Sequence, residues 1–110
     1  MSTQLEPVPG TQHDRRVVVL KVARSSRPSA LAGAIAGVIR EGAIAEVQAI
    51  GAAAVNQAVK AIALASRYLE GDAIQIAFVP LFADVAIGGE ERTAIRLVVS
   101  PRDPALAVQR

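Results

Sequence analysis

The sequence predicts a two-layer α/β sandwich in which one mixed sheet carries two helices on one face. Two observations support this fold class. Strand-like and helix-like segments alternate from the N-terminus before a series of extended segments, and a Gly-Gly pair near the C-terminus suits a tight hairpin turn. Only 3% of the 110 residues are aromatic while 52% are hydrophobic, so the core must be aliphatic. We expect one domain with a modest core, of a kind that often gains stability by oligomerising.

The first half of the chain predicts a strand, a helix and a second strand. The run RRVVVLKVA, residues 15–23, has the β-branched composition of a largely buried strand. The segment SSRPSALAGAIAGVIREG, residues 25–42, has Pro near its start and Gly at its end, as helices do. AIAEVQAI, residues 43–50, predicts the second strand. The first helix is expected to present one apolar face, made of Leu31, Ile35, Val38 and Ile39.

Two glycines in the first helix have a spacing of their own. Gly33 and Gly37 lie four residues apart, and without side chains they would let another element approach the helix closely. We therefore regard this face as a second candidate for subunit packing.

The segment AIGAAAVNQAVKAIALAS, residues 49–66, predicts a longer second helix that ends near residue 69. At about 100° per residue it has three stripes. The first is expected to cover the sheet, the second is polar, and the third is mostly apolar. Because a helix with two apolar faces needs two partners, we expect the third stripe to form a subunit interface in a homodimer or homotetramer. The first stripe is Val55, Ala58, Val59, Ile62 and Leu69; the second is Asn56, Lys60 and Arg67; and the third is Gln57, Ala61, Leu64 and Tyr68.

The remaining segments are extended. GDAIQIAFVP, residues 71–80, predicts a strand that Pro80 stops, and two further strands are expected around Gly88 and Gly89. In the last strand Arg92 and Arg96 share one face, opposite the apolar residues. Residues 1–14 and 103–110 show no period and are expected to be flexible tails, which leaves residues 15–102 as the domain.

The composition argues against an enzyme. There is no cysteine, and the sole histidine, His13, lies in an expected tail, so the domain has no Ser-His pair. Neither glycine-containing turn matches a phosphate-binding motif, and no metal-ligand cluster or cofactor motif is present. No apolar stretch reaches the roughly 18 residues that a membrane span needs. We expect a soluble, cytoplasmic, non-enzymatic protein without a signal peptide.

Positive charge gathers in one region. The net charge is +2, but residues 15–27 carry five basic residues and no acid. In ARSSRPS, residues 23–29, Arg and Ser side chains precede a helix start, a combination that suits phosphate oxygens. The same residues fit a serine cap flanked by solvated arginines, and this loop alone favours the cap.

The stretches KVARSSRPSALAGAIAGVIREGAIAEVQAIGAAAVNQAVKAIALAS and GGEERTAIRLVVSPR strongly resemble the stage V sporulation protein S family, over about residues 17–102. That family in turn resembles the Alba group of small dimeric chromatin and RNA-binding proteins, which share the β-α-β-α-β-β order. The resemblance implies a regulatory protein that binds DNA or RNA through the first loop, the start of the second helix and the hairpin. The residues at those places are Lys21, Arg24, Ser25, Ser26, Arg27, Asn56, Lys60 and Arg92.

Two departures from the Alba pattern predict weak binding. The turn into the second helix reads GAAA where Alba proteins place basic residues, and the lysine-rich first loop becomes RSSR. Fewer neutralised phosphates mean lower affinity, so we expect salt-sensitive, largely sequence-independent binding. Two alternatives remain open at this point. One is a self-associating scaffold that does not bind nucleic acid, and the other is a small-ligand sensor that uses the GAAAVNQ turn.

Overall fold

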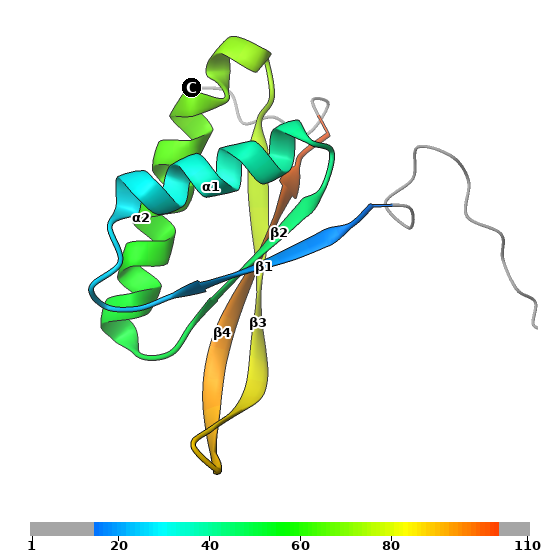
Figure 1. Cartoon of the computed structure of the whole chain (residues 1–110). Coiled ribbons are helices and arrows are strands. Elements are labelled where there is room, and N and C mark those ends of the chain that lie inside the picture. The colour runs from blue at the N-terminus through cyan, green and yellow to red at the C-terminus, as the bar shows by residue number, and fades with distance from the viewer. Residues whose placement is uncertain (1–14, 104–110) are drawn as a thin grey trace, which may run out of the picture.

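A computed structural model describes residues 15–103; the expected N-terminal tail, with His13, and residues 104–110 of the expected C-terminal tail lie outside these. The described chain forms one four-stranded mixed sheet with two helices, as expected (Figure 1). The elements are β1 (Val17–Val22), α1 (Pro28–Arg40), β2 (Ile44–Ala49), α2 (Ala52–Tyr68), a 3-10 turn (Glu70–Asp72), β3 (Ile76–Ile87) and β4 (Glu90–Pro101).

The strand order is β1-β2-β4-β3, so β1 and β3 are the edges of the sheet. β1 and β2 are parallel, while β4 is antiparallel to both of its neighbours. β4 pairs with β2 only from Ile95 to Val99, whereas β3 and β4 pair along their whole length. The outer half of this hairpin therefore extends past β2 as a two-stranded ribbon (Figure 1).

Pro80 does not stop a strand, so the expectation of two separate segments over residues 71–87 is wrong. β3 runs continuously from Ile76 to Ile87, and Pro80 lies in register with Leu97 of β4. A proline has no N–H to donate to a neighbouring strand, which excludes it from the middle of a sheet but not from an edge. The edge position of β3 accounts for the difference.

The turns follow the expected glycines. Gly88 and Gly89 join β3 to β4 with φ angles of 58° and 82°, the positive values that a two-residue hairpin turn requires. Helix α1 ends as expected just before Gly42, whose φ is 81°.

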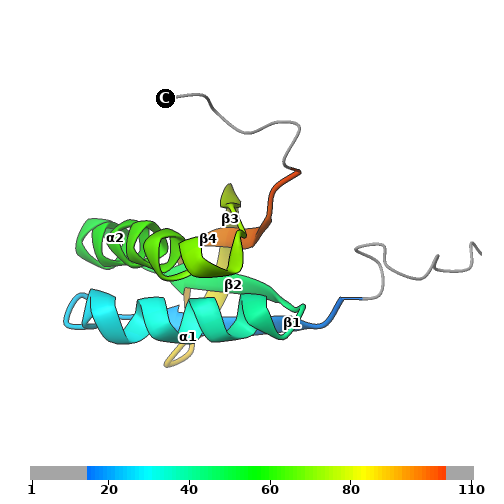
Figure 2. The ribbon, with the colours of Figure 1, turned by 90° about the horizontal axis from the view of Figure 1, so that it is seen from above.

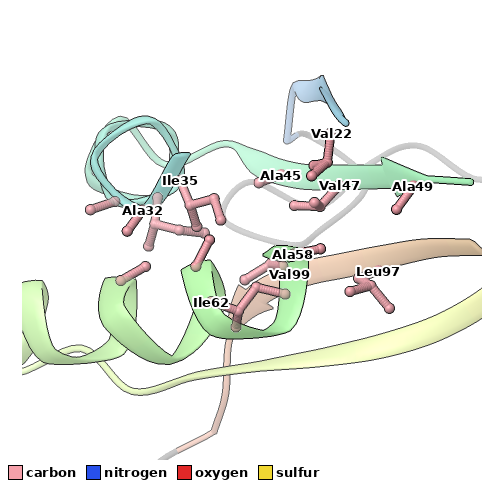
Figure 3. Close-up of a cluster of buried hydrophobic side chains, with 14 of the residues drawn as sticks. Val22, Ala32, Ile35, Ala45, Val47, Ala49, Ala58, Ile62, Leu97 and Val99 are labelled. Carbon is pink, nitrogen blue, oxygen red and sulfur yellow. The ribbon is translucent and has the colours of Figure 1, made fainter. Parts of the chain in front are cut away.

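The core lies between the helices and one face of the sheet (Figure 3). Val47, Leu97 and Val99 contribute from the sheet, and Ile35 contributes from α1. Helix α2 was expected to cover the sheet with Val55 and Val59, but Val59 is 42% exposed. The helix instead buries a stripe of small residues, with Ile62 and Leu69 as its larger members. The small residues are Ala54, Ala58, Ala61 and Ala65.

The second partner of α2 is α1, which lies alongside it (Figure 2). Alanine side chains on α2 allow this close packing, because α2 must fit against a helix and a sheet together. Gly33 and Gly37 do not take part in a close approach: a Cβ built on either meets no atom of the described chain within 4 Å.

Candidate nucleic-acid interface

Two connections lie together at the end of the sheet where β1 and β2 finish. We call this end of the strands the basic edge, as distinct from the edge strands β1 and β3. Because β1 and β2 are parallel, the β1–α1 loop (residues 23–27) and the start of α2 both follow strand ends at the same edge (Figure 1). The Gln57 side-chain amide donates a hydrogen bond of 2.8 Å to the backbone carbonyl of Ser26, which fixes the loop to the helix. The β3–β4 hairpin tip extends beyond the same ends of the strands, so three segments distant in sequence lie at this end of the molecule (Figure 1).

The β1–α1 loop is held by its own hydrogen bonds. The backbone N–H of Ala23 donates to Ser26 Oγ over 2.9 Å, and the N–H of Ser26 donates to the Ala23 carbonyl over 3.0 Å. Ser26 therefore closes the turn and does not cap the helix. The residue at the cap position of α1 is Arg27, which makes no side-chain cap bond. The serine-cap interpretation is wrong, and Arg24, Ser25 and Arg27 are exposed.

Both helices begin at this edge with open amide groups. Neither α1 nor α2 has a side-chain cap, and neither has an acidic residue in its first turn. The first N–H groups of a helix have no partner within the helix, and they carry a partial positive charge. The edge therefore attracts anions through its backbone as well as through its side chains.

The exposed cations at this end are free of ion pairs among residues 15–103. Three other arginines pair with carboxylates: Arg16 with Glu41, Arg40 with Asp72, and Arg96 with Glu46. None of the expected nucleic-acid contacts takes part in these pairs. The expected contacts that are charged, exposed and outside these ion pairs are Lys21, Arg24, Arg27, Lys60 and Arg92.

Arg67 is a cation that the expected site left out. With Lys60, Leu64 and Pro28 it lines a shallow hollow of about 500 Å³ between α2 and the start of α1. The sequence carried a signal for it, because Arg67 falls on the same helical stripe as Asn56 and Lys60.

The expected contacts do not all share one face. Asn56 and Lys60 are exposed on α2, on the helix side of the sheet. Lys21 is in register with Gln48, and Arg92 with Val85, on the sheet face that the helices leave open. Lys21 and Val85 line one small hollow of about 190 Å³. The cations thus flank the edge from both sides, while Glu90 and Glu91 make the hairpin tip acidic.

An apolar groove lies between α2 and the extended hairpin. It has a volume of about 620 Å³, and Phe82 in its wall is 82% exposed. Phe82 is in register with Ile95, so it faces the helix side of the sheet, but it lies on an edge strand that the helices do not cover. Sequence periodicity gave no indication of this exposure. The groove is lined by Gly51, Ala52, Val55, Asn56, Val59, Phe82, Thr93 and Ile95.

The expected subunit interface is partly used within the chain. Ala61 has no exposed surface, and Gln57 is committed to the Ser26 carbonyl. The prediction that Ala61 lies on a subunit interface is therefore wrong, because α1 packs against this face of α2 within the subunit. Gln57 is half-buried, and its place on a subunit interface stays a prediction. Leu64 is half-buried and Tyr68 is 41% exposed, and these two remain accessible.

In residues 15–103, no group of three His, Cys, Asp or Glu residues is placed to hold a metal ion. None of the described helices has the length and apolar character to cross a bilayer.

Taken together, the fold and the site define a small α/β sandwich protein with a basic edge and an exposed apolar groove. A family model described as Stage V sporulation protein S (SpoVS) matches residues 18–102. The chain therefore belongs to the stage V sporulation protein S family, which makes it a sporulation-related small protein and confirms the resemblance drawn from its sequence.

Proposed function

We propose that the chain is a regulatory protein that binds DNA or RNA weakly, with little sequence preference, and does so as a homodimer. The observation that carries the proposal is the common edge where two uncapped helix starts meet exposed, unpaired cations. Phosphate groups fit such an arrangement, since backbone amides and guanidinium groups are their usual partners. The few cations available and the acidic hairpin tip are consistent with weak binding.

Binding is tested by fluorescence anisotropy with labelled duplex DNA and RNA at two salt concentrations. Arg24→Ala with Arg27→Ala removes two phosphate contacts, so we expect weaker binding and a smaller dependence on salt, by about two units of slope in a log-log plot. Arg16→Ala with Arg102→Ala is the matched control. It removes the same charge at the opposite edge of the sheet, where β1 begins and β4 ends. Equal losses in the two variants, or no binding by the wild type at low salt, would overturn the proposal.

The dimer is assigned to the apolar groove. A two-stranded ribbon is only marginally stable alone in water, and within the described part of the chain no third strand pairs with the outer hairpin. In a two-fold dimer the same patch must supply both a projection and a hollow. Phe82 supplies the projection, and the groove floor beside Val55 and Val59 supplies the hollow. Phe82→Ser is expected to halve the mass that light scattering measures. A wild-type protein that is monomeric at high concentration would contradict the dimer.

The same groove favours a second candidate function, a scaffold whose activity is self-association without nucleic-acid binding. This alternative predicts that the wild type dimerises but gives no anisotropy change with either nucleic acid at low salt. Combining the mass measurement with the binding titration separates the two functions.

A further inference from the structure

The sheet has a second face, which the helices do not cover. We call it the open face, and we define it by the side chains that alternate with those of the core. The large exposed hydrophobic residues concentrate here, since five of the eight in the described chain lie on it. These five are Val17, Val19, Val79, Leu81 and Ile87.

The strand registers arrange the open face in rows. One row runs Val19, Glu46, Val98, Val79, and the next runs Lys21, Gln48, Arg96, Leu81. Glu46, Gln48 and Arg96 lie on the central strands, whereas Lys21 is a charged residue on the edge strand β1. Val19 at one end of the first row is 48% exposed, and Val79 at its other end is 59% exposed. The face thus has a polar centre between margins that are aliphatic except at Lys21.

The polar centre is already bonded within the subunit. Arg96 Nε donates a hydrogen bond of 3.0 Å to Gln48 Oε1, and Arg96 lies 3.9 Å from Glu46 Oε1. Burying these side chains in an interface costs less free energy than burying isolated charges, because each already has a partner within the subunit. The separation of 3.9 Å is long for an ion pair, so the carboxylate and the guanidinium keep capacity for further contacts.

The opposite charges of Glu46 and Arg96 at the centre of the open face favour a second copy of the chain as the occupant. In a two-fold interface each patch meets its own copy. Glu46 of one subunit then lies near Arg96 of the other, and the aliphatic margins meet aliphatic margins. The centre of this face does not suit a nucleic acid, because the Glu46 carboxylate lies there, and the two expected phosphate contacts on the face, Lys21 and Arg92, lie away from that centre.

The size of the face is adequate for a dimer. Four strands about 4.8 Å apart and six residues long at about 3.3 Å per residue cover roughly 400 Å² in projection. Side chains make the accessible area larger than the projection. The area therefore approaches the roughly 600 Å² per partner at the lower end of stable interfaces.

We propose that the open face is a self-association surface on which a second copy of the chain packs its own open face, sheet against sheet. The packing is that of a β-sandwich, with the two sheets about 10 Å apart. This surface is distinct from the groove that holds Phe82, because the two lie on opposite faces of the sheet. It requires neither nucleic-acid binding nor the groove dimer. Where both surfaces act, the product is a tetramer.

The test measures the mass of the full chain by sedimentation velocity at high and low concentration. Val19→Glu with Val79→Glu places carboxylates on two exposed positions of the open face, and we expect the wild-type mass to be halved. Phe82→Glu is the matched control on the groove. If it also halves the mass and the combined variant is monomeric, both surfaces act. If Phe82→Glu leaves the mass unchanged, the groove dimer fails while the open-face interface stands.

A second pair of variants keeps the test independent of exposed valines. Arg96→Glu alone puts carboxylates opposite carboxylates, so it should dissociate the copies. Glu46→Arg added to Arg96→Glu restores opposite charges and should restore the wild-type mass. Circular dichroism confirms that each variant is folded. A wild type that is monomeric, or a Val19→Glu, Val79→Glu variant that is folded and keeps the wild-type mass, would overturn the proposal.

Discussion

Gln57 on α2 and Ser26 in the β1–α1 loop are joined by a hydrogen bond of 2.8 Å from the side-chain amide to the backbone carbonyl. The two residues are 31 positions apart, and their contact is part-buried. This bond fixes the loop that carries Arg24 and Arg27 against the start of α2, so it links the stability of the fold to the geometry of the basic edge.

Gln57→Leu should lower the free energy of unfolding by about 1 kcal/mol, because it removes this bond and leaves the Ser26 carbonyl without its partner. We also expect weaker nucleic-acid binding, since the loop is no longer held against α2. Urea unfolding and anisotropy measure the two effects. Gln75→Leu is the control, because the Gln75 residue is exposed and its side chain makes no hydrogen bond to any of residues 15–103. Equal stability of the two variants would contradict the structural role of Gln57.

Ala61→Leu should lower the free energy of unfolding by about 1–3 kcal/mol, because Ala61 is fully buried and a larger side chain overpacks the core. Ala63→Leu on the same helix is exposed and should change stability little. Thermal and urea unfolding compare the two. If Ala61 instead lay on a subunit interface, Ala61→Leu would change the mass and leave the unfolding of the monomer unaffected.

Gly51→Ala should destabilise the chain by about 1–3 kcal/mol, because Gly51 has a φ of 90° and a ψ of 155°, a conformation open essentially to glycine alone. Gly33→Ala should instead stabilise it by about 0.5–1 kcal/mol. Gly33 lies within α1, and an added Cβ meets no described atom within 4 Å. Unfolding midpoints that move in the same direction for both glycines would contradict this account.

Pro80→Val should leave the free energy of unfolding nearly unchanged, because Pro80 lies on the edge strand and its missing N–H costs the sheet little. The same change should increase aggregation on heating, since proline on an edge hinders the addition of further strands. Unfolding and light scattering measure the two effects. A substantial loss of stability with no rise in scattering would show that the proline ring has a packing role.

Part of the candidate site could be predicted because it depends on local sequence. Helix starts, basic residues and their stripes follow from spacing, so exposure of Arg24, Arg27, Asn56 and Lys60 was correctly expected. The exposure of Phe82 could not be predicted, since alternation assigns a side chain to a face but does not say whether anything covers that face. The role of Ser26 was missed for a similar reason, because closing a turn and capping a helix require the same residue type.

The order of the elements, the positive-φ glycine turns and the family follow from the sequence, because each depends on residues close together in the chain. Which neighbour each surface meets follows from the packing of the folded chain. That packing placed α1 against the third stripe of α2, so Ala61 became core, and it put β3 at the edge, so Pro80 stayed within a strand. The physical reason is that periodicity measures the polarity of a face, whereas burial depends on what packs against it.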